Sequence, residues 1–288
     1  MELGAGFPQR AIGSDNGALR DYVQGVEQLG YAHIRAADHV LGADASQYEL
    51  EGPYTHHALF REPLVMFGYA AAITSSIKLV TSVLILSQRQ TALVAKQAAE
   101  VDLLSGGRLE LGIGSGWNEV EYEALGVDFA TRGSRIEEQI GLLRRLWEEP
   151  LVTFDGEHHA FRDAGINPLP GRPIPIWMGG YARVMMERTG RLGDGWLVPP
   201  RFHRPEGFLP RRDRVLAAAE AAGRDPSTIG FNLSVSTKGK DLDEQLRRAE
   251  LWRGMGATRF TVSTNTSGMA TVGEHLEALR AFIEAYPE

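Results

Sequence analysis

The sequence predicts a closed barrel of eight parallel strands, each followed by a helix. Short apolar segments alternate with amphipathic helical segments from end to end of the 288-residue chain. Eight such units have about 36 residues each, which is close to what a (β/α)8 barrel needs. No composition break or charge run divides the chain, so we expect one domain over residues 1–288. A doubly wound open sheet is the competing arrangement, but it usually has fewer strands.

The expected strands are short apolar segments that recur at similar intervals. They cover residues 3–7, 31–37, 77–86, 108–113, 174–178, 196–198, 229–235 and 259–262. The segment 77–86 is apolar almost throughout, which is typical of a strand with both faces buried in a parallel sheet.

The expected helices carry apolar residues at spacings of three and four. They cover residues 18–29, 63–74, 91–104, 135–147, a segment that ends near 192, 210–222, 242–255 and 272–285. In the first helix Leu19, Tyr22 and Val26 mark the buried face, and Gly30 ends it.

Three short insertions interrupt the alternation, after strands two, four and six. Residues 42–61 are rich in Tyr, His and Glu, and residues 199–209 form a loop of Pro, Arg and His. In residues 151–161, Asp155 and Gly156 lie between apolar segments, which predicts a hairpin with a type I′ turn. Such insertions often carry lids and substrate loops.

The composition excludes several classes of protein. With 30 basic and 37 acidic residues the net charge is −7, which argues against nucleic acid or an anionic membrane as a partner. The chain has no cysteine, which excludes disulfides, thiolate metal sites and a catalytic thiol. We find no signal peptide and no apolar segment long enough for a bilayer, so we expect a cytoplasmic protein.

In a barrel of this kind, the carboxyl ends of the strands carry the active site. Asp38 and His39 follow the second strand, and Ser82 and Val83 lie in the third. Histidine is the side chain that ordinarily changes its charge near neutral pH, so His39 is the candidate for moving a proton during catalysis. The alternative, which the residues alone slightly favour, is a structural histidine that caps the strand.

Glycines after the fourth and fifth strands indicate a ligand. Gly114 belongs to a glycine-rich segment that would leave open backbone beside a flat ligand, with Asn118 able to donate and accept hydrogen bonds. Gly179 and Gly180 precede a helix, where free amides attract a phosphate. A tight strand–helix turn explains these two glycines equally well.

Two tryptophans and an arginine are candidates for the substrate pocket. Trp117 and Trp177 fall at or next to strand ends, although core packing is the commoner use of Trp. Arg201 lies in the basic loop after the sixth strand and is placed to receive an anionic ligand. No histidine pair has a third ligand at zinc spacing, so we expect no metal site. No nucleophile elbow supports a hydrolase.

Several segments together resemble the luciferase-like monooxygenase superfamily. Residues 103–117 (LLSGGRLELGIGSGW) look like its third helix and fourth strand, and residues 173–180 (PIPIWMGG) look like its fifth strand. Residues 194–196 (DGW) match the segment before its sixth strand. The strand ending ADHV at residues 37–40 is similar to the branch that uses the deazaflavin coenzyme F420.

The resemblance implies a TIM barrel with a flat cofactor at the carboxyl ends of its strands. It implies that His39 lies near the reactive ring carbon, with Asp38 beside it, and these two are the catalytic residues that we predict. Ser82 and Val83 would form a bulge with a non-proline cis peptide bond that supports the ring from behind.

The same resemblance assigns further cofactor-binding positions. Asn118 resembles a residue that binds the ring or its side chain, and Gly179, Gly180 and Tyr181 resemble the phosphate-binding turn. Trp117 stands where the sugar-phosphate dehydrogenases of this branch carry an acid, which argues against a sugar-phosphate substrate.

The function that we predict is an oxidoreductase that transfers a hydride between F420 and an unidentified small organic substrate. An FMN-dependent monooxygenase of the same superfamily is the first alternative. A non-catalytic flavin-binding protein is the second, and a barrel hydrolase or lyase without cofactor is the last. The resemblance also suggests a homodimer that uses helices near strands two to four.

Overall fold

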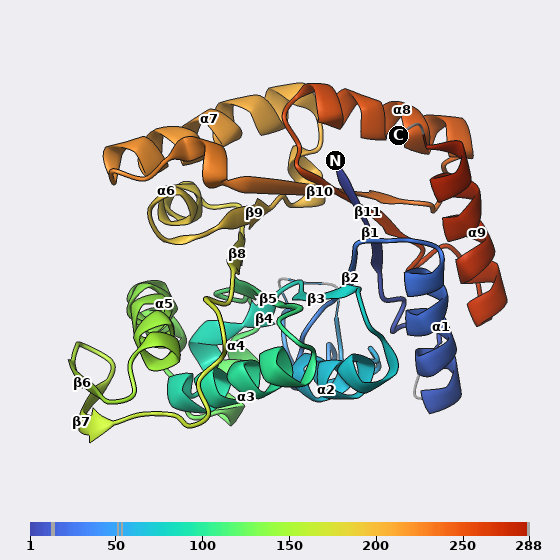
Figure 1. Ribbon diagram of the computed structural model, residues 1–288. Helices are drawn as coiled ribbons and strands as arrows, with labels where there is room; N and C mark the ends of the chain where they lie inside the picture. The colour runs from blue at the N-terminus through green and yellow to red at the C-terminus, as the bar shows by residue number, and fades with distance from the viewer. Residues whose placement is uncertain (13–14, 51, 53, 287–288) are drawn as a thin grey trace.

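The computed structural model of the protein describes residues 1–12, 15–50, 52 and 54–286. Eight parallel strands close into a barrel, which confirms the predicted fold (Figure 1). In spatial order these are β1 (Glu2–Gly6), β2 (His33–Ala36), β3 (Lys78–Thr81), β5 (Leu109–Gly114), β8 (Ile176–Gly179), β9 (Gly195–Leu197), β10 (Gly230–Ser236) and β11 (Arg259–Ser263). β11 pairs with β1, and this pairing closes the sheet.

The long helices lie outside the strands and cover them. They are α1 (Asn16–Gln28), α2 (Pro63–Ile73), α3 (Thr91–Leu104), α5 (Arg132–Glu148), α6 (Arg183–Leu192), α7 (Pro205–Ala221), α8 (Leu242–Gly254) and α9 (Val272–Ala285). Polar side chains cap several of their first turns: Asp15 accepts the amides of Gly17 and Ala18, and Thr271 forms a capping box with Glu274. The bounds predicted for α3 and α9 are confirmed. Within the described part of the chain, no helix combines the length and the apolar character needed to cross a membrane.

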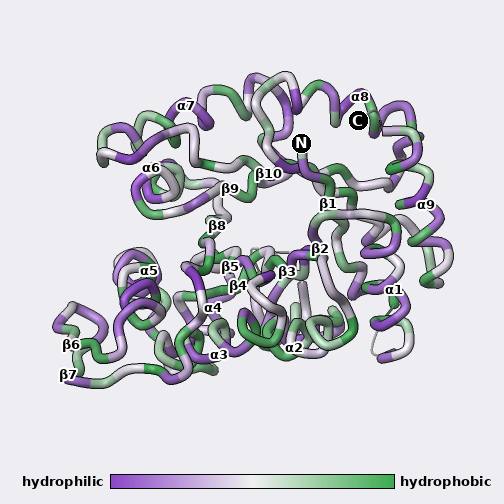
Figure 2. Tube along the Cα trace, viewed as in Figure 1, coloured by the Kyte–Doolittle hydropathy of each residue, from purple (hydrophilic) through white to green (hydrophobic). Residues whose placement is uncertain are grey.

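One helix, α2, consists almost entirely of apolar residues (Figure 2). Leu64, Phe67 and Ala71 pack into the core. Val65 and Tyr69 point outward and are 69% and 42% exposed. A helix that is hydrophobic all round is normally covered on every side. The homodimer stays a prediction.

Charged side chains close the amino-terminal end of the barrel. Arg259 forms buried hydrogen bonds to both carboxylate oxygens of Glu110 and an ion pair with Glu2. Its guanidinium also lies 4.4 Å from the ring centre of Trp177. Burial lowers the pKa of the Arg259 guanidinium, but its bonds to Glu110 and Glu2 outweigh this and raise it overall. These side chains fill this end of the barrel, and active sites of this fold lie at the opposite end, where the strands have their carboxyl ends.

The predicted third strand, residues 77–86, is divided in two. β3 ends at Thr81 and a second short piece, β4 (Leu84–Ile85), continues beyond Ser82 and Val83. The Ser82–Val83 peptide bond is cis, as the family resemblance implies. The 3-10 helix η1 (Leu86–Gln88) then leads away from the barrel.

The hairpin predicted within residues 151–161 forms, as β6 (Val152–Asp155) and β7 (Ala160–Ala164), but its type I′ turn is wrong. Asp155 pairs with Ala160, so residues 156–159 make a wider loop, closed by a 2.9 Å bond from the Gly156 amide to the His159 carbonyl. The reason is Glu138 on α5, whose carboxylate accepts the amides of residues 157 and 158.

The predicted loop at residues 199–209 is partly helical, and so is the segment between the predicted strand 108–113 and the predicted helix 135–147. The short helix α4 (Glu119–Ala124) follows β5, and a 3-10 turn, η2 (Phe129–Thr131), precedes α5. After β9, the chain forms η3 (Pro200–Phe202) and α7 begins at Pro205 instead of at Pro210. Either proline can begin a helix, because the amide groups of the first helical turn have no acceptor within the helix and the missing N–H of proline is no loss.

Gly112, in the middle of β5, has no room for a side chain. A Cβ atom there would lie 1.9 Å from the Thr81 carbonyl oxygen and 2.7 Å from a methyl carbon of Leu197. Gly112→Ala should therefore destabilise the protein by about 1–3 kcal/mol, measured by urea unfolding. Gly141→Ala on α5 is the matched control: nothing lies within 4 Å of its Cβ, and it should stabilise by up to ~1 kcal/mol. An unchanged midpoint for Gly112→Ala would contradict the close packing of β5.

Candidate active site

A pocket of about 380 Å³ opens at the carboxyl ends of β2, β3, β5 and β8. It is lined by Ala37, Asp38, His39, Tyr54, Ser82, Val83, Ile85, Gly114, Ser115, Gly116, Trp117, Arg132, Gly179, Gly180, Tyr181, Ala182 and Met185. Most of the residues predicted from strand ends are among them. Tyr54 comes from the insertion after β2, whereas the β6–β7 hairpin packs on α5 outside this pocket.

His39 is oriented by a carboxylate that sequence reasoning missed. Its Nδ1 lies 2.9 Å from Oε2 of Glu121, which is 1% exposed on the inner face of α4. The other oxygen of Glu121 accepts the amides of Val40 and Leu41 at 2.6 and 3.2 Å. A carboxylate on Nδ1 fixes the ring orientation and leaves Nε2 as the nitrogen available for proton exchange.

Aromatic rings enclose the imidazole. Tyr54, Phe60 and Trp117 meet it edge-on, with ring centres 5.2, 4.8 and 5.4 Å away. They come from the insertion after β2 and from the segment after β5. His39 is thus held in an apolar setting that limits its contact with water.

Asp38, the second predicted catalytic residue, is buried beside His39 and hydrogen-bonded through both carboxylate oxygens. Its Oδ1 accepts a 2.8 Å hydrogen bond from Arg89, and its Oδ2 accepts the Ile85 amide at 3.1 Å. Burial raises the pKa of this carboxyl group, and the Arg89 guanidinium opposes that rise. Through these two hydrogen bonds Asp38 ties the end of β2, next to His39, to β4 and to Arg89.

Val83 forms one wall of the pocket because two strands carry glycine opposite it. A Cβ on Gly114 would lie 2.8 Å from one Val83 methyl carbon, and a Cβ on Gly179 would lie 2.6 Å from the other. The Val83 side chain therefore occupies the space that side chains on β5 and β8 would otherwise fill. The outcome is a small apolar surface next to open backbone, which suits a flat ring.

The turn after β8 offers positive charge to a ligand. Gly180 has φ of +139°, a conformation that favours glycine. α6 then begins without a side-chain cap, so its first amides are available to an anion. Arg132 lines the same pocket. Tyr181 is exposed at the rim, with the Arg201 guanidinium 5.0 Å from its ring centre.

Two predicted site residues lie elsewhere. Trp177 is the second residue of β8, not its end, and its ring packs between Gly195, Gly230 and Arg259 at the closed end of the barrel. The prediction that it walls the substrate pocket is therefore wrong. Asn118 is buried and its amide donates to the Leu41 carbonyl at 3.4 Å.

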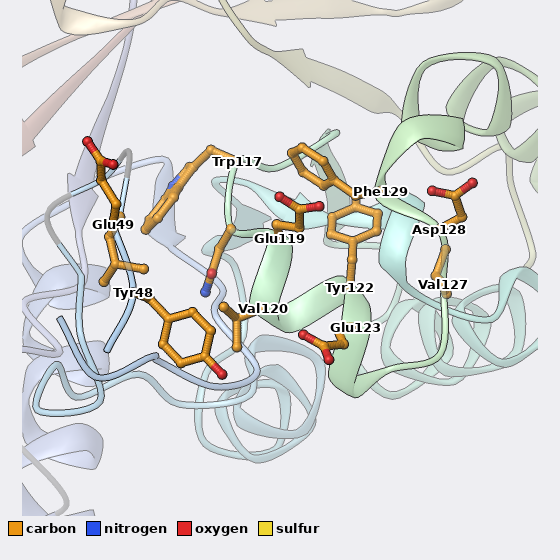
Figure 3. Close-up of a pocket in the computed structure, with 12 residues that line it drawn as sticks. Tyr48, Glu49, Trp117, Glu119, Val120, Tyr122, Glu123, Val127, Asp128 and Phe129 are labelled. Carbon is orange, nitrogen blue, oxygen red and sulfur yellow. The ribbon is translucent and has the colours of Figure 1, made fainter. Parts of the chain in front are cut away.

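Asn118 and Trp117 line a second pocket, of about 500 Å³, next to the first. Figure 3 shows Trp117 and Tyr48 toward one end of it and Phe129 and Asp128 toward the other. Trp117 is thus the wall shared by the two pockets.

Arg89 neutralises the buried Asp38 carboxylate, so Arg89→Met should cost about 3–5 kcal/mol of stability at pH 7. Burial already raises the folded-state pKa of Asp38, and loss of Arg89 raises it further. A carboxyl group whose pKa is raised in the folded state stabilises the protein most at a pH below its unfolded-state pKa, and least at neutral pH. The difference in unfolding free energy between wild type and Arg89→Met should therefore shrink as the pH falls from 7 toward 4.

Urea unfolding of both proteins across this pH range checks the prediction. Arg183→Met, which breaks an exposed pair with Glu187 on α6, is the control and should change little. If the loss of stability in Arg89→Met did not change with pH, the Asp38 carboxylate would not be its cause.

Comparison with known proteins agrees with this geometry. The family model for luciferase-like monooxygenase matches residues 5–286. An F420-dependent glucose-6-phosphate dehydrogenase of Kineococcus radiotolerans is 30% identical over 253 residues, covering 84% of this chain and 70% of that protein. An F420-dependent hydroxymycolic acid dehydrogenase of Mycobacterium tuberculosis is 30% identical over 81% of this chain and 62% of its own length. An uncharacterized protein of Mycobacterium bovis is 40% identical over 139 residues, so this match spans about half of either chain (48% of each).

Solved structures share the fold. A monooxygenase from Streptomyces bottropensis superposes with a TM-score of 0.79 at 21% identity, covering 99% of this chain and 98% of that one. An F420-dependent secondary alcohol dehydrogenase, solved with an F420–acetone adduct, also gives 0.79, at 17% identity and with 100% and 99% coverage. Because the family model matches this chain over nearly the chain's whole length, the chain belongs to the luciferase-like monooxygenase family.

Proposed function

We propose that the protein is an oxidoreductase that transfers a hydride between coenzyme F420 and a small organic substrate. The observation that carries the proposal is the pocket itself, in which the His39–Glu121 pair, the Val83 wall and the turn after β8 converge. Relatives that share most of this chain's length are F420-dependent dehydrogenases by name, which supports the choice of cofactor.

The residues present fit a flat phosphorylated cofactor. Val83, flanked by Gly114 and Gly179, would support one face of a ring. The amides at the start of α6 and the Arg132 side chain would hold a phosphate. When bound, a deazaflavin supplies two-electron hydride chemistry, and the protein supplies orientation and a dry site.

His39 would handle the proton that accompanies hydride transfer. Oxidising an alcohol to a carbonyl releases one hydride and one proton, and a base must take the proton. Nε2 of His39 is suited to this, because Glu121 holds Nδ1 and the surrounding rings exclude water. In the reverse direction the same nitrogen would return the proton.

Titration of the purified protein with F420 and with FMN tests the proposal and its main alternatives. We expect F420 to bind more tightly and to support turnover, observed through the absorbance and fluorescence of the ring. Tighter FMN binding, with oxygen-dependent turnover, would instead establish the FMN monooxygenase. Tight binding of either cofactor with no redox chemistry on any substrate would favour the non-catalytic flavin-binding protein. If neither cofactor bound, a hydrolase or lyase without cofactor would be favoured.

His39→Ala should lower turnover by about 10²–10⁴-fold while leaving F420 affinity nearly unchanged. Glu121→Gln should also slow turnover, because the amide in place of the carboxylate would favour the wrong tautomer of His39. His57→Ala, on the exposed part of the insertion after β2, is the control and should behave as wild type. Wild-type turnover by His39→Ala would remove this residue from the mechanism.

The remaining expectations complete the proposal. We propose a homodimer in which the apolar outer face of α2 is covered. A small molecule as partner, with no role for nucleic acid or membrane, and the cytoplasmic location stay predictions from the sequence.

A further inference from the structure

Arg35 places a positive charge inside the barrel, just below the candidate active site. Its side chain comes from β2 and lies half-buried among residues of four strands. Nε and Nη2 both donate to the hydroxyl oxygen of Ser82, the first at 2.9 Å. Nη1 donates to Oδ1 of Asn232 and to the hydroxyl of Thr261, each at 3.3 Å.

These acceptors are all neutral, which distinguishes Arg35 from its neighbours. Arg259 and Arg89 each pair with two carboxylates. Among the residues that the structure describes, none forms an ion pair with Arg35. Burial, and the nearby Arg259, lower the pKa of Arg35 to about 10, so the guanidinium still carries its charge at neutral pH. A charge inside a protein normally has a partner of opposite sign, and here the protein does not supply one.

The hydroxyl of Ser82 has a hydrogen left to donate. A serine oxygen can accept two hydrogen bonds and donate one. Both acceptor positions of Ser82 are taken by Arg35, and we find no acceptor for its hydrogen in the described part of the chain. Ser82 also lines the active-site pocket. A hydroxyl that accepts from a cation is a stronger donor, because hydrogen bonds in a chain polarise one another.

Small polar residues line the layer of the barrel above Arg35. Thr261 and Asn232 face inward, so Ser263 and Ser234, two residues further along each strand, face the same way. Gly6 faces Ser263, with only 3.4 Å between its Cβ position and the serine hydroxyl. Small polar residues of these three strands thus form the layer above Arg35, toward the carboxyl ends of the strands.

We propose that Arg35 and Ser82 form an anion site in which the guanidinium charge, relayed through the Ser82 hydroxyl, binds a negatively charged oxygen of a ligand in the pocket. The oxygen has two sources: the ring of the reduced cofactor, or a carboxylate of the substrate. The anion site rests in part on the proposed function. It also deepens that function, because it predicts that a ligand of the same pocket carries a negative charge.

Acetate binding by the cofactor-free protein tests the site independently of F420. At equal ionic strength, sodium acetate should raise the melting temperature of wild type more than sodium chloride does. Arg35→Met should lose this difference, and Arg35→Lys, which keeps the charge, should retain part of it. Arg20→Met, which removes an exposed arginine of α1, is the control and should respond as wild type.

Equilibrium binding of oxidised and reduced F420 then identifies the source of the oxygen. If it is the ring, Arg35→Met weakens binding of the reduced form at least ~10-fold more than that of the oxidised form, which corresponds to ~30 mV in the two-electron potential. If it is the substrate, both forms keep their affinity ratio while the acetate effect is lost.

The proposal is overturned if Arg35→Met matches wild type in both measurements. Circular dichroism checks that the variant is folded; if it is not, Ser82→Ala, which removes the hydroxyl between Arg35 and the ligand but keeps the guanidinium, replaces it in both measurements with the same expected losses. Failure of F420 to bind any of these proteins would overturn the proposed function, while the acetate measurement would still decide the anion site.

Discussion

The contact of Val83 with Gly114 and Gly179 is the constraint on which the site depends. Three neighbouring barrel strands end where this side chain sits, and two of them can make room for it only because they carry no Cβ. The third strand leaves the regular sheet at Ser82, so that Val83 lies across the strand ends instead of along them. The apolar wall, the open backbone beside it and the position of Ser82 all follow from this one fit.

Charge inside the barrel is distributed in a way that matches this wall. The buried carboxylates have partners: Glu110 bonds Arg259, Asp38 bonds Arg89, and Glu121 bonds His39 and two backbone amides. Arg35 and Arg132 are instead bonded to neutral oxygens. A protein with a net charge of −7 therefore presents positive groups where its ligands enter. Such an arrangement suits ligands that carry negative charge.

Much of this architecture could be predicted from the sequence, because buried parallel strands and amphipathic helices leave periodic patterns. The parallel strands of a barrel all end on the same face. The predicted strand ends therefore already placed His39, Ser82, Gly114 and Gly179 near one another, and the structure has them in one pocket. The bulge at Val83 was predicted only through the family resemblance. No periodic pattern distinguishes an apolar segment that bends from one that does not.

The errors have physical causes that lie outside local patterns. Trp177 was misplaced because an apolar strand does not reveal which of its residues reach the open end of the barrel. Glu121 was missed because it lies on a helix too short to show a period, and its partner is 82 positions away. Asp155 and Gly156 predicted a tight turn that the distant carboxylate of Glu138 overrides. Arg35 was overlooked because a single cation within a strand gains its meaning only from Ser82 and Asn232 across the barrel.

We expect Val83 and the turn after β8 to hold one flat phosphorylated cofactor between them. A crystal structure of the protein with F420 would test this. We expect the ring against the Val83 side chain, His39 Nε2 on the side of the ring that faces the substrate, and the phosphate at the first amides of α6. A ring bound elsewhere, or a phosphate away from residues 180–183, would contradict it.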